Sequence, residues 1–152
     1  MEKEGLIRAV QWLQENEIQL ATLITDRHLQ IGKWIREILE NTKHFFDVWH
    51  VAKGLKKKMV AVGKEKEYDS INPWIRSITN HLYWCAASRD GDESKQVLKK
   101  WNSVINHIQN DHNETRDASA CQHESLEGKE RKKKWLEPGS QAMVKLEKVL
   151  TN

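Results

Sequence analysis

Cysteine and proline are scarce in this sequence, and long apolar runs are missing altogether. Its 152 residues include two prolines and two cysteines, Cys85 and Cys121. Two cysteines are too few for a disulfide framework, which favours a reducing compartment. No run approaches the ~18 apolar residues that cross a membrane, and residues 1–10 lack the apolar core of a signal peptide. We therefore expect an intracellular chain without a membrane partner.

Common catalytic motifs are missing as well. The sequence contains no glycine-rich phosphate loop, no G-x-S-x-G, no H-E-x-x-H and no C-x-x-C pair. The hydrolase, kinase, zincin and redox classes that depend on these motifs are therefore unsupported. The formal net charge is only +3, which permits a nucleic-acid partner without arguing for one.

The residues that are plentiful indicate a globular chain with a modest core. Hydrophobic residues make up 38% of the sequence and charged residues 31%, which is ordinary for a soluble domain. Seven tryptophans are many for this length. They either fill the core or mark apolar surfaces that normally meet other parts of a larger protein.

The segment 20–51 organises the prediction of the fold. It holds two short apolar runs that each end on an acid, LATLIT before Asp26 and HFF before Asp47. The apolar residues between these runs recur at the spacing of one helix face: Ile31, Trp34, Ile35, Ile38 and Leu39. This order predicts a βαβ unit with parallel strands near 19–25 and 43–48. Asp26 would then lie at the carboxyl end of a buried strand, where open α/β sheets usually keep their reactive groups.

Helical patterns dominate the rest of the chain. One helix is expected over residues 3–17, and another begins at His50. Asn72 followed by Pro73 predicts the N-cap and first residue of a further helix, and Ser140 predicts the N-cap of the last one. Two apolar stripes predict an antiparallel pair of helices, with Ile75, Ile78, Leu82 and Cys85 in one and Val97, Leu98, Trp101, Val104, Ile105 and Ile108 in the other.

The sequence predicts no strand after Val51, so the expected fold class is α/β turning mainly α, with most residues helical. A two-stranded sheet is small for a parallel α/β domain, which normally covers a larger sheet on both faces. We interpret residues 1–66 as a partial α/β core. Residues 67–152 are expected to form a helical region with a polar loop at 111–128. The missing strands of the sheet are expected on a segment that this sequence does not include.

Asp26, Asp47 and His50 are the first set of candidate functional residues. An acid after a strand can cap the following helix, and the same local role is open to Asp47 or His50. The alternative for Asp26 is a ligand of Mg²⁺, because hard divalent cations take carboxylate oxygens. Two such ions can activate a phosphodiester, but one aspartate cannot hold both. Asp47 is the neighbouring acid, although its side chain can point away from Asp26.

His107, His112, Cys121 and His123 form the second set. Their spacing is H-x4-H, then eight residues, then C-x-H. Three imidazoles and a thiolate can complete a tetrahedral Zn²⁺ site, and a metal would hold a loop that has little apolar material. The spacing matches no standard zinc finger, and Cys85 is an alternative ligand. The other interpretation is a histidine-bearing helix end followed by an irregular loop without metal.

Lysines cluster along the predicted helix that begins at His50. Lys53, Lys56, Lys57 and Lys58 lie away from its apolar stripe, and Lys64 and Lys66 follow them. These lysines form either a solvated helix face or a basic ridge along a phosphate backbone. The run KERKKK at 129–134 is a candidate nuclear localisation signal or phosphate-binding patch. The expected location is therefore nuclear or otherwise intracellular.

Two stretches of the sequence resemble a known family. ITDRHLQIGKWIRE at 24–37 and TKHFFDVWHVAKGLKKKM at 42–59 are similar to the middle of DDE-type transposases. The likeness is to the Mutator-like and related cut-and-paste enzymes and to proteins derived from such transposons, and it covers residues 22–59. NHLYWCAAS and KERKKKWLEPGS resemble, more loosely, segments of the helical insertion in these proteins.

The resemblance implies a partial ribonuclease-H-like core that is followed by a helical insertion. By position, Asp26 matches the second catalytic aspartate, and Asp47 with His50 matches a D-x-x-H element. The resemblance also implies Mg²⁺ or Mn²⁺ at Asp26 in an intact parent protein, and homo-oligomers in the parent family. DNA is the implied partner of the lysines Lys53, Lys56, Lys57 and Lys58.

The sequence also departs from the family pattern. No residue matches the first catalytic aspartate, and Glu147 lacks the sequence context of the catalytic glutamate. One of three acids cannot assemble a two-ion site, so we expect a transposase-derived fragment without nuclease activity of its own. One alternative is a basic helical module that binds nucleic acid or a protein partner without chemistry. The other is an intact Mg²⁺-dependent phosphodiesterase whose remaining acids lie elsewhere in the sequence.

Overall fold

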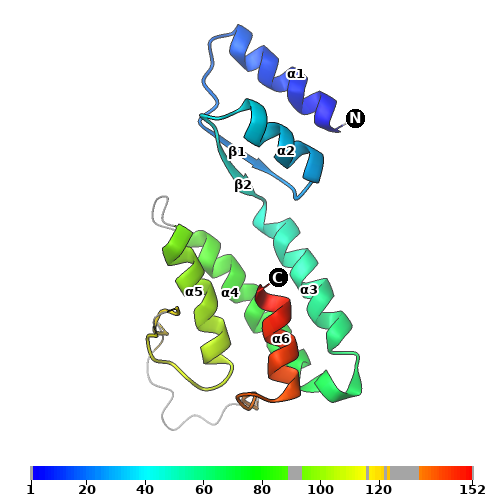
Figure 1. Cartoon of the computed structure of the whole chain (residues 1–152), viewed down its shortest axis with the longest axis vertical. Helices are drawn as coiled ribbons and strands as arrows, with labels where there is room; N and C mark the ends of the chain where they lie inside the picture. Colours follow the sequence, from blue (N-terminus) through cyan, green and yellow to red (C-terminus); the bar gives the residue numbers. More distant parts are fainter. Residues whose placement is uncertain (1, 89–93, 116, 122, 124–133, 152) are drawn as a thin grey trace. The chain divides into compact units, whose positions relative to one another are not determined.

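A computed structural model describes residues 2–88, 94–115, 117–121, 123 and 134–151. The described chain is mostly helical and contains a small two-stranded parallel sheet (Figure 1). It divides into two compact units, Met1–Val51 and Ala52–Asn152. The division between these units lies inside helix α3 (Val48–Val62), whereas the sequence placed a boundary after residue 66.

The first unit contains the predicted βαβ arrangement. Its elements are α1 (Glu2–Glu15), β1 (Thr22–Thr25), α2 (Leu29–Ile38) and β2 (Lys43–Phe46). The two strands are parallel and in register from the pair Thr22 and Lys43 to the pair Thr25 and Phe46. The predicted strand order and direction are confirmed, but each strand is only four residues long. After the last pair, the Asp47 amide donates to the Thr25 carbonyl and α3 begins at once.

Apolar side chains of α1 and α2 build a small core in this unit. Its buried members are Val10, Ile31, Ile35 and Leu39, and Leu6, Leu20, Leu23 and Trp34 pack against them. Ile38 was predicted on the same face but is 59% exposed at the last residue of α2. Ile24 and Phe46, one on each strand, are 63% and 48% exposed. The sheet therefore leaves large apolar side chains open to solvent.

The second unit holds the larger core. Its elements after α3 are the 3₁₀ segment η1 (Lys66–Trp74), α4 (Ile75–Ala87), α5 (Ser94–His107) and α6 (Gln141–Thr151). Helices α4 and α5 pack side by side, and η1 packs against α4 and α6 (Figure 1). The buried side chains that join them are Met59, Ile71, Trp74, Ile75, Ile78, Val104, Ile108, Leu136, Ala142, Met143, Leu146 and Leu150. The predicted pairing of the two central helices agrees with this packing.

Of the two helix N-caps that the sequence predicts, one is wrong and one is confirmed. Asn72 is not the N-cap of α4, because Asn72 and Pro73 belong to η1 and α4 begins at Ile75. The Asn72 side-chain amide instead donates to the carbonyl of Gly63 at 2.8 Å, a tertiary contact that no local pattern reveals. Ser140 does cap α6, since its hydroxyl oxygen accepts the amide of Met143 at 3.2 Å.

Some predicted features fall outside the described residues. They are residues 116, 122 and 124–128 of the polar loop, and the basic run 129–134 apart from Lys134. Among the residues that are described, no helix is both long and apolar enough to cross a bilayer.

Candidate metal centre

The first ligand candidate, His107, lies at the end of α5, where the backbone makes a well-defined turn. The Asp111 amide donates to the Asn106 carbonyl at 3.0 Å, and the Asn110 amide donates to the His107 carbonyl at 3.1 Å. Asn110 adopts a left-handed conformation with φ of 64°. This pair of bonds around one left-handed residue is the Schellman motif, which stops a helix and reverses the chain. The turn directs the following loop back along α5.

Specific bonds hold this loop against the helix that it follows. The Ser119 amide donates to the Lys99 carbonyl at 3.1 Å, and the Asn102 side-chain amide donates to the Asp117 carbonyl at 3.0 Å. Ala118, between these two anchors, is only 3% exposed. The loop then returns toward its own beginning and brings the last two ligand candidates close to the first two.

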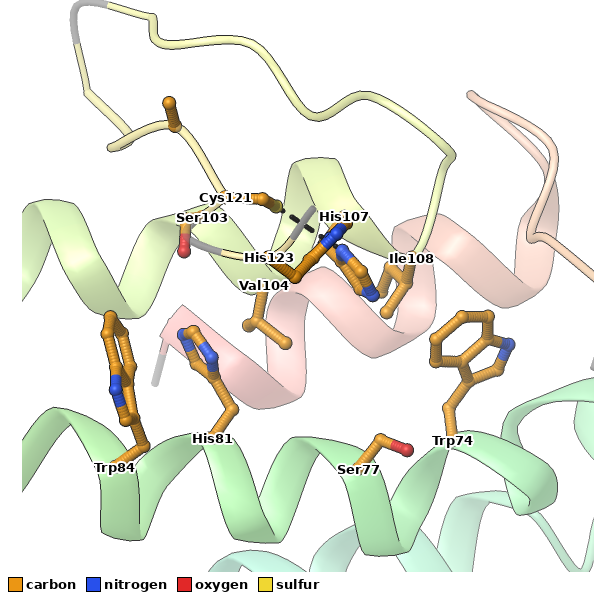
Figure 2. A pocket seen from close by; sticks show the side chains of 11 residues that line it. Trp74, Ser77, His81, Trp84, Ser103, Val104, His107, Ile108, Cys121 and His123 are labelled. Carbon is orange, nitrogen blue, oxygen red and sulfur yellow. Dashed lines mark hydrogen bonds between the residues drawn. The ribbon is translucent and has the colours of Figure 1, made fainter. Parts of the chain in front are cut away.

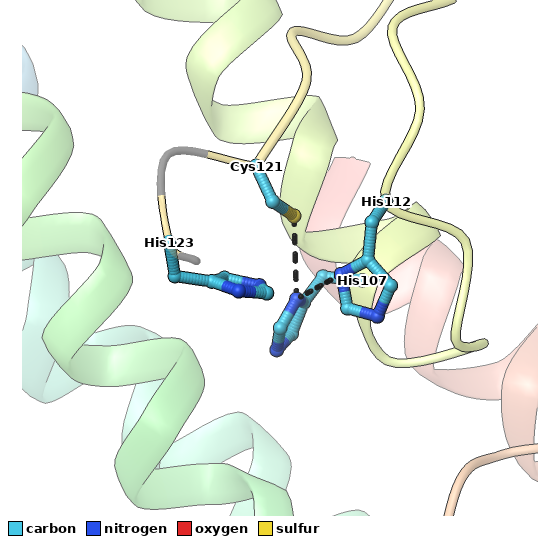
Figure 3. A group of neighbouring side chains, drawn as sticks. All are labelled: His107, His112, Cys121 and His123. Carbon is cyan, nitrogen blue, oxygen red and sulfur yellow. Dashed lines mark hydrogen bonds between the residues drawn. The ribbon is translucent and has the colours of Figure 1, made fainter. Parts of the chain in front are cut away.

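The four predicted ligands converge at one point (Figure 3). Their ligand atoms all lie within 4.8 Å of one another. His107 Nδ1 is 3.2 Å from His112 Nδ1 and 3.3 Å from Cys121 Sγ. With zinc–nitrogen bonds of about 2.0–2.1 Å and zinc–sulfur bonds of about 2.3 Å, neighbouring ligand atoms of a tetrahedral site are roughly 3.3–3.6 Å apart. The cluster could therefore hold a metal such as zinc with little rearrangement.

The orientation of His112 suits metal binding. The Cys121 amide donates to the His112 carbonyl at 3.2 Å, which fixes the two residues relative to each other. On its ring, His112 Nε2 lies 3.2 Å from Asn110 Oδ1. An amide oxygen only accepts, so Nε2 carries the proton and the lone pair is on Nδ1, which faces the cluster. A hydrogen bond on the outer nitrogen is the usual way in which proteins orient a metal-binding histidine.

Tryptophan rings form an apolar wall beside the cluster. The centroid of Trp135 is 5.7 Å from those of both His107 and His112, and it meets both rings edge-on. Trp74 lies 6.2 Å from His107 and 5.5 Å from Trp135, and its indole nitrogen donates to the Lys134 carbonyl. The cluster also lies at the carboxyl end of α5, where the helix dipole favours positive charge. Both features strengthen the binding of a cation by neutral imidazoles and a thiolate.

A cavity of about 310 Å³ opens next to the ligands, between α4 and α5 (Figure 2). Trp74, Val104 and Ile108 give it apolar walls, and Cys121 and His123 lie at its edge. His81 projects into the same space, and burial lowers the pKa of its ring. Its Nε2 lies 2.7 Å from the Lys100 carbonyl, so this nitrogen carries a proton and donates it to the carbonyl. Cys121 lines this cavity and is only partly buried.

Cys85, the alternative ligand in the sequence analysis, does not belong to the cluster. It lies in α4 and is 2% exposed. Burial raises the pKa of its thiol to about 11. A thiol with these properties is a poor ligand and a poor nucleophile, because both roles need the thiolate.

The two cysteines should therefore differ in reactivity, and only one should respond to metal. In metal-free, folded protein we expect iodoacetamide to modify Cys121 at least about tenfold faster than Cys85, because Cys121 is only partly buried whereas Cys85 is buried and has a raised thiol pKa. With zinc added, the Cys121 rate should fall to that of Cys85. Mass spectrometry of the alkylated peptides measures both rates, and urea-unfolded protein is the control in which both react. A Cys121 rate that ignores zinc would contradict thiolate ligation.

Asp26 lies directly after β1, at the carboxyl end of the strand as predicted. Its Oδ1 accepts a 3.3 Å hydrogen bond from the His28 amide, just before α2. Among the described residues, the group of potential ligands with three or more members is the His/Cys cluster, and Asp26 is outside it. The Mg²⁺ or Mn²⁺ site at Asp26 stays a prediction.

Asp47 and His50 contact each other at the start of α3. Asp47 Oδ1 accepts the amide of Trp49 at 2.9 Å, and Asp47 Oδ2 lies 2.9 Å from His50 Nδ1. The Trp49 amide, followed by the His50 ring, lowers the pKa of the Asp47 carboxyl. This is the local helix-capping role that the sequence analysis gave as the alternative to a place in an active site.

The lysines predicted to contact DNA are all exposed on α3. Lys53, Lys56 and Lys57 are spaced at i, i+3 and i+4, so they share one side of the helix. Lys58 is turned about 100° from Lys57, since each residue of a helix advances by that angle. Ala52 and Met59 are the buried residues of α3, whereas the four lysines are exposed to solvent.

Comparisons with protein-family models, with curated proteins and with solved structures gave no match to this chain. The assignment of the candidate metal site is therefore supported by its geometry alone. Two residues that support it were missed in the sequence analysis. Asn110 could have been found, because an asparagine directly after a helical pattern is a typical left-handed C-terminal residue. Trp135 gave no comparable signal, since its contact with the histidines is long-range.

Proposed function

We propose that this chain is a transposase-derived module in which one structural Zn²⁺ fastens the helical unit, and that it binds DNA without cutting it. The zinc part rests on one observation, the convergence of four ligand atoms within 4.8 Å. Unrelated surface histidines do not have to converge in this way. Here the convergence depends on a helix-ending turn, two loop anchors and the bond from Cys121 to His112.

Zinc suits this ligand set better than other common ions. Imidazole and thiolate are the usual ligands of zinc, whereas Mg²⁺ and Ca²⁺ prefer oxygen. Four protein ligands fill a tetrahedral shell, so no position is left for a water or a substrate. The role that follows is structural. The metal holds a loop in which Ala118 is the buried apolar residue among those that the structure describes.

Two features of the first unit support the transposase ancestry. The parallel βαβ arrangement carries Asp26 and the Asp47–His50 pair at the ends of its strands, which is where the resemblance places family residues. The exposed Ile24 and Phe46 support the interpretation that a partial ribonuclease-H-like sheet is incompletely covered, because parallel sheets are normally covered on both faces.

Loss of cleavage follows from the same residues. Two-ion phosphodiester chemistry needs several carboxylates around one point. Within the described part of the chain, Asp26 is not in a group of three potential ligands, and Asp47 is engaged by the amide of Trp49 and by His50. DNA binding does not depend on the missing acids, because phosphate contacts need positive charge but no catalytic group, and the exposed lysines of α3 supply that charge.

Metal analysis tests the zinc part of the proposal directly. The full chain, purified without chelator, should contain one equivalent of zinc by elemental mass spectrometry. Cobalt substitution should give the strong d–d absorption of a tetrahedral site. His112→Ala should lower the zinc content to below about one-tenth of an equivalent, and His28→Ala, which changes an exposed histidine of the first unit, should leave it unchanged. Protein that stays metal-free in added zinc would contradict the proposal.

A further inference from the structure

We propose that Asn110 is a positioning residue of the zinc centre. Its backbone ends α5, and its side chain determines which ring nitrogen of His112 binds the metal. The inference rests on the proposed zinc site and goes beyond it. It assigns a role to a residue that is not a ligand, and it states which ring nitrogen of His112 binds the metal.

The backbone of Asn110 explains why few residue types fit this position. Its φ of 64° lies in the left-handed region, which glycine and asparagine tolerate best. This conformation lets the amides of Asn110 and Asp111 satisfy the last carbonyls of α5. The backbone alone therefore makes glycine an equal or better choice than asparagine here.

The side chain explains why asparagine has a function that glycine cannot supply. Asn110 Oδ1 lies 3.2 Å from Nε2 of His112, only two residues away in the chain. This contact keeps the proton of His112 on Nε2 and turns Nδ1 toward His107 Nδ1, which lies 3.2 Å away. Without it, a neutral histidine can place its proton on either nitrogen, and the ring can rotate away from the metal.

A second helix end in the same chain provides a matched comparison. After α1, the Ile18 amide donates to the Leu13 carbonyl and the Glu17 amide donates to the Gln14 carbonyl, with Glu17 at φ of 58°. This is the same Schellman geometry with a different side chain, far along the chain from the metal ligands. Glycine at position 17 reproduces the backbone effect of glycine at position 110 and changes nothing at the cluster.

Three variants of the full chain separate the backbone role from the positioning role. Asn110→Gly should keep the helix end, with unchanged far-ultraviolet circular dichroism, but bind zinc about 10–100-fold more weakly in competition with a chromophoric chelator. Asn110→Asp keeps an acceptor oxygen on a residue that tolerates the left-handed region, so its affinity should stay within about threefold of the unchanged protein. Glu17→Gly should bind zinc as the unchanged protein does.

Nitrogen-15 NMR of the imidazole rings gives a readout that a purely structural role would not move. In the zinc-bound, unchanged protein, His112 should show a protonated Nε2 and a metal-bound Nδ1. In Asn110→Gly the resonances should shift to a mixture of tautomers or of ligand nitrogens. Equal zinc affinity and identical His112 spectra for Asn110→Gly and the unchanged protein would overturn this inference alone. Failure of the unchanged protein to bind zinc would overturn the zinc proposal beneath it.

Discussion

Removing zinc from the full chain is expected to lower its melting temperature by roughly 15–30 °C. A ligand present at about 1,000 times its Kd stabilises the folded state by about 4 kcal/mol. In a domain of 60–100 residues, each kcal/mol moves the melting temperature by about 4–8 °C. The structural reason is the loop at 111–121, which has polar residues and few buried contacts to replace the metal. Thermal unfolding with and without a strong chelator measures the shift.

Matched cysteine variants show whether the shift comes from this site. Cys121→Ser should melt at the temperature of the chelated protein and no longer respond to chelator, because the thiolate ligand is gone. Cys85→Ala removes a buried thiol of α4 and should also lower the melting temperature, by the cost of a small cavity. It should nevertheless keep the full chelator shift. A full chelator shift that survives in Cys121→Ser would contradict the role of this thiolate as a ligand.

The ligands of this centre could be predicted from the sequence, but their arrangement could not. Histidine and cysteine are recognisable as ligands by their chemistry, so His107 and Cys121 were found by residue type alone. Their approach depends on the left-handed turn at Asn110 and on the bond between Ser119 and Lys99, which lie 20 residues apart. Periodicity carries no information about such a long-range bond. For the same reason the spacing alone left open whether Cys85 was a ligand.

The same distinction between local patterns and tertiary contacts explains which parts of the fold could be predicted. The parallel strands were predicted because their apolar runs and the helix between them are local patterns. The N-cap predicted at Asn72 was wrong because Asn72 lies inside η1 and α4 begins only at Ile75. The Asn72 side-chain amide donates to the Gly63 carbonyl, nine residues earlier, which is a tertiary contact. The Ser140 cap was right because its partner, Met143, is three residues away. Sequence patterns therefore predicted the structural features that depend on contacts between residues close in the sequence.

Replacing the four lysines of α3 should have the largest effect on DNA binding. We expect the full chain to bind duplex DNA with an affinity that falls steeply as salt rises. Each phosphate contact contributes about 0.9 to the slope of log K against log salt concentration. Alanine at Lys53, Lys56, Lys57 and Lys58 should lower this slope by about three to four and weaken binding at low salt by at least about tenfold. Fluorescence anisotropy over a salt series measures both quantities.

The control must remove the same charge from other surfaces. Alanine at Lys3, Lys33, Lys95 and Lys148 gives an equal change in net charge on α1, α2, α5 and α6. Alanine is a strong helix former, so neither variant should lose its helices. If binding reflected net charge alone, the slope of log K against log salt concentration would fall equally in both variants. A larger loss in the α3 variant places the phosphate contacts on that helix, because counterion release depends on where the lysines meet the DNA. Equal losses would leave α3 without a special role, and no binding by the unchanged chain at low salt would remove DNA as its partner.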